Sequence, residues 1–334
     1  MKCFTAVLLF FCSLAVGQVS SALSLQARIA LPNVDGRMDH LAVDVKGQRV
    51  FVSALGNHIV EVLDVKAGQR TRSLPNLDEP QGLLYEASTN RLFVATGDGN
   101  TRIYDGATFQ LLHTVKFSDD SDNIRYDPRG SNAVVGYGGE KGLRLRLHGS
   151  GALAFIDANG KQGGEIVVDA HPESFQLEKN GKRIFVNVPD KREIQVADIA
   201  KKDVLRSWPT TAAGSCFPMA LDEAHQRLFS GCRSPARLLV FDMASGRSLV
   251  SLEIAGDTDD LFYDAARSRV YVIGGQGFID VLQQKDADHY ERIARYPTPS
   301  GTRTGLFVPE WGKLFAAVPH RGGQSSELLV YDAK

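Results

Sequence analysis

The sequence lacks the patterns on which several functional classes depend. It contains no Gly-x-Ser-x-Gly motif, no P-loop, no dinucleotide-binding glycine motif and no Cys-x-x-Cys pair, which argues against the nucleophile, nucleotide and haem-attachment chemistries that use them. The formal net charge is -1, so the basic excess typical of nucleic-acid-binding proteins is missing. No stretch of useful length has a helical hydrophobic period. We therefore expect an all-β protein that does not bind nucleic acid.

Long hydrophobic runs are also missing, apart from one short run at the N-terminus. Lys2 precedes an apolar run over residues 4–16, and small residues follow as far as Ala22. This arrangement is typical of a secretory signal peptide, and the run is too short to span a bilayer. We predict a signal peptide over residues 1–22, with cleavage after Gly17 or after Ala22. The mature chain is then periplasmic or secreted, with no transmembrane segment.

Cysteine is scarce, with four residues in the whole chain. Removal of the signal peptide removes Cys3 and Cys12, so only Cys216 and Cys232 remain. Disulfides persist in the compartments to which exported proteins go. We predict that these two residues form a disulfide, since the repeat described next places both at one end of one unit. The alternative is two separate buried thiols, because a free cysteine packs like a small hydrophobic residue.

A short phrase recurs along almost the whole chain, first as Arg49-Val50-Phe51-Val52. Each copy reads as a strand, a turn rich in glycine and asparagine, and a second strand, which ends in Asp except in the sixth copy, where it ends in Gln283. Clear copies begin at residues 49, 91, 183 and 227, and weaker copies begin at 133, 269 and 313. The residue that ends the second strand of the phrase stands at positions 64, 105, 157, 198, 242, 283 and 332. The chain therefore contains seven repeats.

The repeats predict a seven-bladed β-propeller over residues 23–334. Each unit can be written as four short antiparallel strands, and four-stranded units of about 40 residues are typical of propeller blades. After Asp332 only two residues remain, so the seventh unit lacks its fourth strand, whereas residues 24–31 precede the first unit with nothing to pair with. We predict that this N-terminal strand completes the last blade, which would remove the open edges of the ring.

The repeat Arg-x-(Phe/Tyr)-Val, followed by Gly-Asn and a valine-rich strand ending in Asp, resembles the YVTN-type (YncE-like) bacterial β-propeller family. The resemblance covers residues from about 25 to 334 and implies a seven-bladed exported propeller. The sequence departs from the family pattern at Ser53-Ala54 and at Ala95-Thr96, where the family has Thr-Asn. The motif is structural, and members of the family serve as binding, surface or unassigned proteins, so the resemblance implies little about function.

Two sets of recurring residues have a structural interpretation. The arginine before each aromatic residue recurs in the same place in successive units, so we expect it to pair with the acidic residue that ends the first strand of its unit. The expected pairs are Arg49 with Asp44, Arg91 with Glu86, Arg183 with Glu178, Arg227 with Asp222, and Arg269 with Asp264. By the same reasoning, the core between blades should contain Phe51, Phe93, Phe185, Phe229, Tyr271 and Phe315.

The candidate functional residues stand just before the first strand of each unit. In a propeller, the loops before the first strands converge around the central channel, so the residues there form a ring. This ring is acidic, and the loops around it are basic. The candidate ligand-binding residues are Asp39, His40, Gln81, Asp122, Asn123, His171, Glu173, Asp259, Asp260 and Arg303 in the ring, with Arg233, His320 and Arg321 in the surrounding loops.

Three functional hypotheses follow. The leading one is a non-catalytic, monomeric propeller that binds a small polar ligand or a periplasmic protein at the channel mouth. The second is a metal-dependent hydrolase or lactonase in which Asp122, Glu173 and Asp260 hold a divalent cation (Ca²⁺, Mg²⁺ or a transition metal), with His40 or His171 as the base. The third is an accessory subunit of a periplasmic redox enzyme. Against any metal site, the carboxylates could simply accept hydrogen bonds in their own turns and pair with Arg37 and Arg303.

Overall fold

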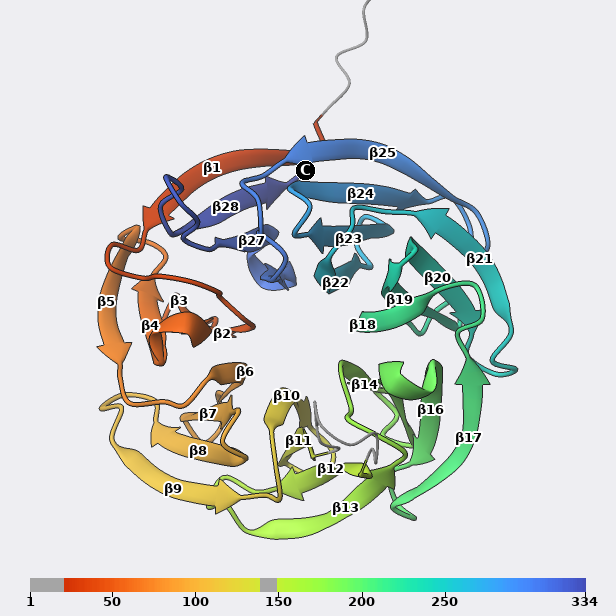
Figure 1. The fold of residues 1–334 in the computed structure, drawn as a ribbon, viewed down its shortest axis with the longest axis horizontal. Helices are drawn as coiled ribbons and strands as arrows, with labels where there is room; N and C mark the ends of the chain where they lie inside the picture. The colour runs from red at the N-terminus through yellow and green to blue at the C-terminus, as the bar shows by residue number, and fades with distance from the viewer. Residues whose placement is uncertain (1–20, 139–148) are drawn as a thin grey trace, which may run out of the picture.

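Seven four-stranded antiparallel sheets surround a central axis in the computed structural model, which describes residues 21–138 and 149–334 (Figure 1). The predicted seven-bladed all-β propeller is therefore confirmed. The predicted signal peptide lies outside the described residues except for its last two positions, Ser21 and Ala22. No helix among the described residues is long and apolar enough to cross a membrane.

Each blade begins with its innermost strand and ends with its outermost strand. Blade 1 contains β2 (Leu41–Asp44), β3 (Arg49–Ala54), β4 (Ile59–Asp64) and β5 (Gln69–Leu74), and blade 2 contains β6 (Pro80–Glu86), β7 (Arg91–Thr96), β8 (Asn100–Asp105) and β9 (Leu111–Lys116). Blade 3 contains β10 (Ser121–Asp127), β11 (Asn132–Gly138), β12 (Gly151–Ile156) and β13 (Gln162–Val168), and blade 4 contains β14 (Phe175–Leu177), β15 (Arg183–Val188), β16 (Glu193–Asp198) and β17 (Asp203–Pro209).

The remaining blades follow the same order, and the last one is completed by the first strand of the chain. Blade 5 contains β18 (Gly214–Asp222), β19 (Arg227–Ser234), β20 (Ala236–Asp242) and β21 (Ser248–Glu253), and blade 6 contains β22 (Thr258–Asp264), β23 (Arg269–Gly274), β24 (Phe278–Gln284) and β25 (Tyr290–Pro297). Blade 7 contains β26 (Gly305–Val308), β27 (Lys313–Val318), β28 (Glu327–Ala333) and β1 (Leu23–Ala30). Short 3-10 turns are η1 (Leu55–Asn57), η2 (Pro189–Lys191) and η3 (Pro309–Trp311).

The two ends of the chain close the ring, as the sequence predicted. Strand β1 pairs antiparallel with β28, from Leu23 opposite Ala333 to Ala30 opposite Glu327. Figure 1 shows β1 as the outermost strand of this blade. The side chain of Ile29 packs into the core between blades 7 and 1 and is 1% exposed. Strand β1 thus supplies both the main-chain hydrogen bonds and the apolar packing that close the ring. Closure is a tertiary contact between the two ends of the chain.

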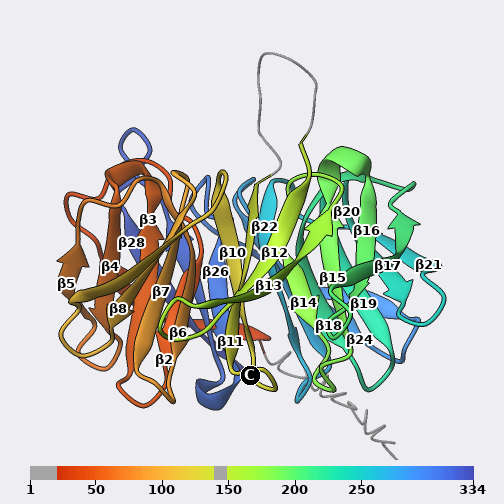
Figure 2. The same cartoon turned by 90° about the horizontal axis from the view of Figure 1, so that it is seen from below.

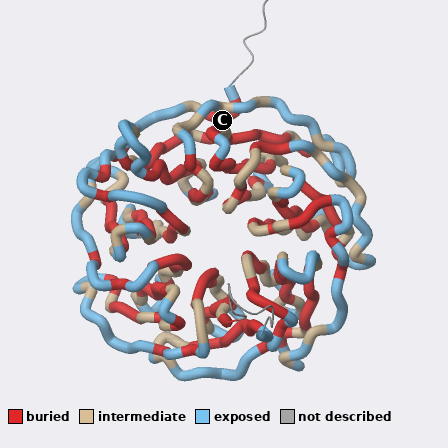
Figure 3. Tube along the Cα trace, in the orientation of Figure 1, coloured by how far each residue is buried: buried red, intermediate tan, exposed pale blue. Residues whose placement is uncertain are grey.

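The core lies between neighbouring blades, where the recurring aromatic residues meet. Phe51, Phe93, Phe185, Phe229, Tyr271 and Phe315 are all buried, which confirms their predicted place. Phe51 packs against residues of blade 2, and Phe185 packs against residues of blade 5. Inner and middle strands are mostly buried and outer strands mostly exposed, as Figure 3 shows. Seen from the side in Figure 2, the blades stand next to one another with loops at both ends of the ring.

The predicted arginine pairs are correct in two blades and wrong in three. Arg49 Nη2 lies 2.7 Å from Asp44 Oδ2, and Arg183 Nη2 lies 2.6 Å from Glu178 Oε1. In the other three blades the arginine turns to the end of the third strand: Arg91 bonds to Asp105 at 3.4 Å, Arg227 to Asp242 at 3.2 Å, and Arg269 to Gln283 at 3.1 Å. The expected acidic partners accept local bonds instead: Glu86 from Thr89, Asp222 from His225 and Asp264 from Arg267. In each of these blades the residue that ends the first strand and the residue that ends the third strand lie on either side of the arginine, because these strands flank the second strand.

The predicted disulfide is confirmed. Cys216 on β18 lies directly opposite Cys232 on β19, and the two residues form a disulfide. Both cysteines are buried in the core between blades 4 and 5. The bond joins the two innermost strands of blade 5 near the start of β18.

Replacing Ile29 by alanine should destabilise the propeller by about 2–4 kcal/mol, because it opens a cavity beneath the closing strand. The matched control is Leu25→Ala on the same strand, where the side chain is 42% exposed and the change should stay within about 0.5 kcal/mol. Urea unfolding followed by circular dichroism measures both free energies. Equal losses for the two variants would show that β1 does not close the ring by packing.

Replacing Cys216 and Cys232 together by serine should lower the free energy of unfolding by about 2–4 kcal/mol, because the unfolded chain regains the freedom of the loop between them. Thermal unfolding of the variant, compared with the parent protein in the presence and absence of a reductant, measures this loss. If the reductant does not lower the midpoint of the parent protein, the two cysteines do not stabilise the fold through a disulfide.

Candidate functional site

The starts of the inner strands bring polar residues from several blades together at one end of the channel. We call Asp39, His40, Asp122, Asn123, His171, Glu173 and Asp260 the mouth cluster. They stand at or just before strands β2, β10, β14 and β22. Gly82 allows the close approach of the neighbouring inner strand, since a Cβ atom there would lie 2.0 Å from the carbonyl oxygen of Asp122. Strand packing therefore determines where these side chains meet.

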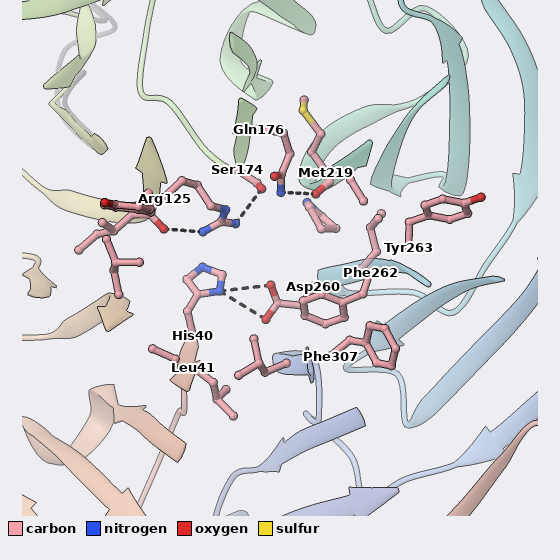
Figure 4. A pocket seen from close by; sticks show the side chains of 18 of the residues that line it. His40, Leu41, Arg125, Ser174, Gln176, Met219, Asp260, Phe262, Tyr263 and Phe307 are labelled. Atoms are coloured by element: carbon pink, nitrogen blue, oxygen red, sulfur yellow. Dashed lines mark hydrogen bonds and ion pairs between the residues drawn. The ribbon is translucent and has the colours of Figure 1, made fainter. Parts of the chain in front are cut away.

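His40 lies at the centre of the mouth cluster and contacts two other blades across the axis (Figure 4). Its Nδ1 lies 3.3 Å from Asp260 Oδ1, and its Nε2 lies 3.9 Å from Asp122 Oδ1. The neighbouring Asp39 places Oδ1 3.8 Å from the same Nε2. Asp260 also accepts a hydrogen bond of 2.9 Å from the main-chain N–H of Gly305 in blade 7. One imidazole thus connects blades 1, 3 and 6.

These carboxylates keep His40 charged. Burial alone would favour the neutral imidazole, but Asp260, Asp39 and Asp122 together raise the pKa of His40 to about 10. Burial also raises the pKa of Asp39 to about 6, although His40 and Arg37 oppose that shift. These carboxylates therefore favour an imidazolium at neutral pH, which holds them together and is a poor general base.

The orientation of the Asn123 amide is linked to the charge of His40. Its Nδ2 lies 3.4 Å from His40 Nε2, while its Oδ1 is buried without a hydrogen-bond partner among the described residues. Rotating the amide by 180° exchanges these atoms, so that Oδ1 accepts the Nε2 proton of the imidazolium. The rotated amide therefore suits an imidazolium, whereas the orientation in the structure suits a neutral imidazole that is protonated on Nδ1 and accepts at Nε2.

A second group in the mouth cluster has the composition of a metal site. One ligand atom each from Asp122, His171 and Glu173 lies within 4.8 Å of the others. His171 Nδ1 lies 2.6 Å from the carbonyl oxygen of Gly138 and donates to it, so Nε2 faces Asp122 Oδ2 at 3.7 Å. Metal-binding histidines are held by this kind of main-chain bond. Asp260, the third ligand expected from the sequence, belongs instead to the His40 contact.

Two arginines in the mouth have carboxylate partners of their own. Asp259 accepts from Arg233 and lies 3.0 Å from Arg303 Nε. Arg303 also contacts Asp257 at 3.2 Å, and the Arg233 guanidinium stacks on Phe217 at 3.8 Å. Asp259, Arg233 and Arg303 therefore satisfy one another, as the structural interpretation of these carboxylates expects.

Three residues of the sequence-based set lie apart from the His40 contacts. Gln81 is buried and donates a 2.6 Å hydrogen bond to Asp120, which links blades 2 and 3. His320 pairs with the exposed Asp35 at 3.2 Å, and Arg321 forms a main-chain bridge with Gln324. These contacts belong to the loops of single blades or to one boundary between blades.

The channel beyond the mouth cluster contains a cavity of about 490 Å³. Its lining runs from His40 and Asp260 at the starts of the inner strands to Lys179 and Glu223 beyond their ends. Arg125 and Gln176 also line it, and neither was among the candidate residues predicted from the sequence. The aligned inner strands do contain a signal: the corresponding positions in the other blades are Ala42, Leu84, Ala220, Phe262 and Leu306. Arg125 and Gln176 are thus the two polar residues at an aligned position that is apolar in the other five blades.

Comparisons with known proteins support the fold alone. No family model matches the chain, and no curated protein matches it. Among solved structures, it is similar to a chain of a mitotic checkpoint complex crystal structure, with a TM-score of 0.75 and 13% sequence identity over 98% of both chains. At this identity the likeness concerns architecture. The molecule is thus a seven-bladed β-propeller, and membership of the YVTN-type family stays a prediction.

The charge state of His40 predicts a specific pH dependence. Its folded-state pKa of about 10 lies above the ordinary value of 6.5, so its contribution to stability is fully present below pH 6.5 and is lost as the pH rises through 10. Replacing His40 by glutamine should therefore destabilise the protein most near pH 6, and the difference from the parent protein should shrink toward pH 10. Urea unfolding over this range measures the difference. A difference that does not vary with pH would contradict a raised pKa.

Proposed function

We propose that this propeller is a non-catalytic protein that binds a small polar ligand at the mouth cluster. The observation that carries the proposal is that no single residue type recurs at the aligned position of His40. Arginines and aromatic residues that support the blades recur from unit to unit. The position of His40, in contrast, holds Asn123 in blade 3, Asp260 in blade 6, and Gly82, Ser174, Pro218 and Thr304 in the other blades. The blade does not need one residue type at this position, so another requirement accounts for His40 and Asp260.

The energetic cost of the mouth cluster supports the same conclusion. Asp39, Asp122 and Asp260 are 1%, 5% and 7% exposed, respectively. Buried carboxylates cost several kcal/mol each unless charged or hydrogen-bonded groups compensate them. Apolar residues would stabilise this end of the channel at a lower cost. Rigid strands from several blades hold the polar atoms in place, which is the usual construction of a binding site.

The charge on His40 favours binding over catalysis. A general base must accept a proton at the working pH, and an imidazolium with a pKa of about 10 cannot do so. The hydrolase hypothesis with His40 as its base is therefore disfavoured. The carboxylates of the mouth cluster are hydrogen-bond acceptors, so the ligand should donate hydrogen bonds through amine or hydroxyl groups.

A second candidate function, a metal-dependent hydrolase, rests on one observation. Asp122, His171 and Glu173 offer two carboxylates and an imidazole close together, a donor set that suits a transition metal. Such an ion would polarise a substrate carbonyl as a Lewis acid. In this candidate His171 is a ligand, which leaves neither of the two histidines as the base.

We also propose that the protein acts outside the cytoplasm. The Cys216–Cys232 disulfide is typical of an oxidising compartment. Together with the signal peptide predicted from residues 1–22, it supports a periplasmic or secreted protein.

Thermal unfolding of the purified protein with a panel of small polar probes tests the binding function. The probes are putrescine, choline, glycine and glucose, together with Mg²⁺, Ca²⁺ and Zn²⁺. A probe that binds the folded state at about 100 times its Kd stabilises it by about 2.7 kcal/mol. We expect at least one organic probe to raise the unfolding midpoint saturably, and Asp122→Asn to abolish this effect. The control is Asp78→Asn, because the Asp78 side chain is 63% exposed.

The same panel separates the two candidate functions. Saturation by one metal ion per chain, lost in both Glu173→Gln and His171→Gln and without any response to the organic probes, would support the hydrolase instead. A panel without any saturable response, or a response that Asp122→Asn leaves unchanged, would contradict binding at the mouth cluster.

A further inference from the structure

Arg125 is a cation in the channel that has no carboxylate partner among the described residues. It belongs to β10, and Figure 4 shows its guanidinium reaching into the cavity toward β14. Nη1 donates to the carbonyl oxygen of Ile124 at 2.8 Å, and Nη2 donates to Ser174 Oγ at 3.3 Å. Both acceptors are neutral, and within residues 21–138 and 149–334 Arg125 has no ion pair. A guanidinium has five N–H donors in a fork that matches a carboxylate, so donors remain.

Asp260, a carboxylate of the same cavity, is already engaged. Asp260 lines the cavity, but it contacts His40 Nδ1 at 3.3 Å and accepts from the Gly305 N–H at 2.9 Å. Burial lowers the pKa of Arg125, and the more distant charges of Asp260 and Asp122 only partly oppose this shift. The guanidinium therefore bears a desolvation cost that a bound anion would offset.

The cavity walls around Arg125 are largely apolar. Leu84, Phe262 and Leu306 line the cavity and are half-buried. Gln176 lines it as well, but its amide N–H already donates to the carbonyl oxygen of Met219 at 2.9 Å. The volume of about 490 Å³ is in the range of small-molecule pockets, which combine apolar walls with a few polar groups that fix orientation.

We propose that the channel binds a small organic acid, with its carboxylate on Arg125 and its apolar body against Leu84, Phe262 and Leu306. This site is distinct from the proposed polar-ligand site, because it uses the opposite charge and lies along the channel beyond the His40–Asp260 contact. A failure to detect binding of the organic acid therefore does not decide whether the mouth cluster binds a polar ligand.

The probe for this site is 4-(trifluoromethyl)benzoate, followed by ¹⁹F NMR on the purified protein. Saturable binding is expected, with an affinity about tenfold or more above that of the neutral 4-(trifluoromethyl)benzyl alcohol, because a charge-assisted hydrogen bond is lost in the alcohol. This comparison needs no variant. Arg125→Met should reduce the affinity for the acid about tenfold or more and leave that for the alcohol nearly unchanged.

Two variants complete the design. Arg72→Met is the matched control, because the Arg72 guanidinium lies on the outer strand β5 and bonds to the carbonyl oxygen of Thr108. Arg125→Lys keeps the charge and should retain part of the affinity for the acid. Equal affinities for the acid and the alcohol, no saturable binding of the acid, or an Arg125→Met variant that binds the acid as well as the parent would overturn the proposal. None of these outcomes bears on the polar-probe panel.

Discussion

The pairing of β1 with β28 is the contact on which the arrangement of the whole molecule depends. Each blade is a small sheet that buries its two faces against its neighbours, so a break anywhere in the ring exposes two apolar faces. Strand β1 prevents this by supplying both main-chain hydrogen bonds and the buried side chain of Ile29. Once the ring is closed, the starts of all the inner strands point to a single axis. The mouth cluster exists because of that convergence.

The convergence of the inner strands brings carboxylates close together, and His40 reduces the repulsion between them. Three carboxylates from three blades, Asp39, Asp122 and Asp260, lie within 4 Å of one imidazole. Their repulsion is strong in a buried site, where charges are poorly screened. A protonated histidine among them lowers that repulsion, and the same carboxylates raise its pKa. The charge on His40 is therefore a property of the assembled ring, and it bears directly on whether this face can perform acid-base chemistry.

Along the axis the chemistry changes from acidic to basic. The mouth cluster presents carboxylates, whereas the cavity beyond it presents Arg125 among apolar walls. The His40–Asp260 contact lies between the two. Two adjoining sites with opposite charge preferences are compatible with a propeller, because each blade contributes its own side chain at each level of the channel and need not match its neighbours.

Much of this fold is readable from the sequence, because its determinants are local and periodic. The repeat of strand, turn and strand gave the number of blades, and the strand left over at the N-terminus gave the mode of closure. The aromatic core and the disulfide followed from the same alignment. Each of these features depends on which residue stands where within a repeat, and hydrophobic alternation and turn residues encode that directly.

The candidate site was predictable only as a set of residues near one end of the channel. Distances between blades decided which members meet: His40 joins Asp260, His171 joins Asp122 and Glu173, and Gln81 turns to a neighbouring blade. The partners of Arg91, Arg227 and Arg269 were likewise a choice between two acceptors at the same end of a sheet. The sequence by itself determined the repeat, its closure and its core. Only the tertiary structure decided the charge of His40 and the isolation of Arg125, because both depend on burial and on charges from other blades, which no local pattern encodes.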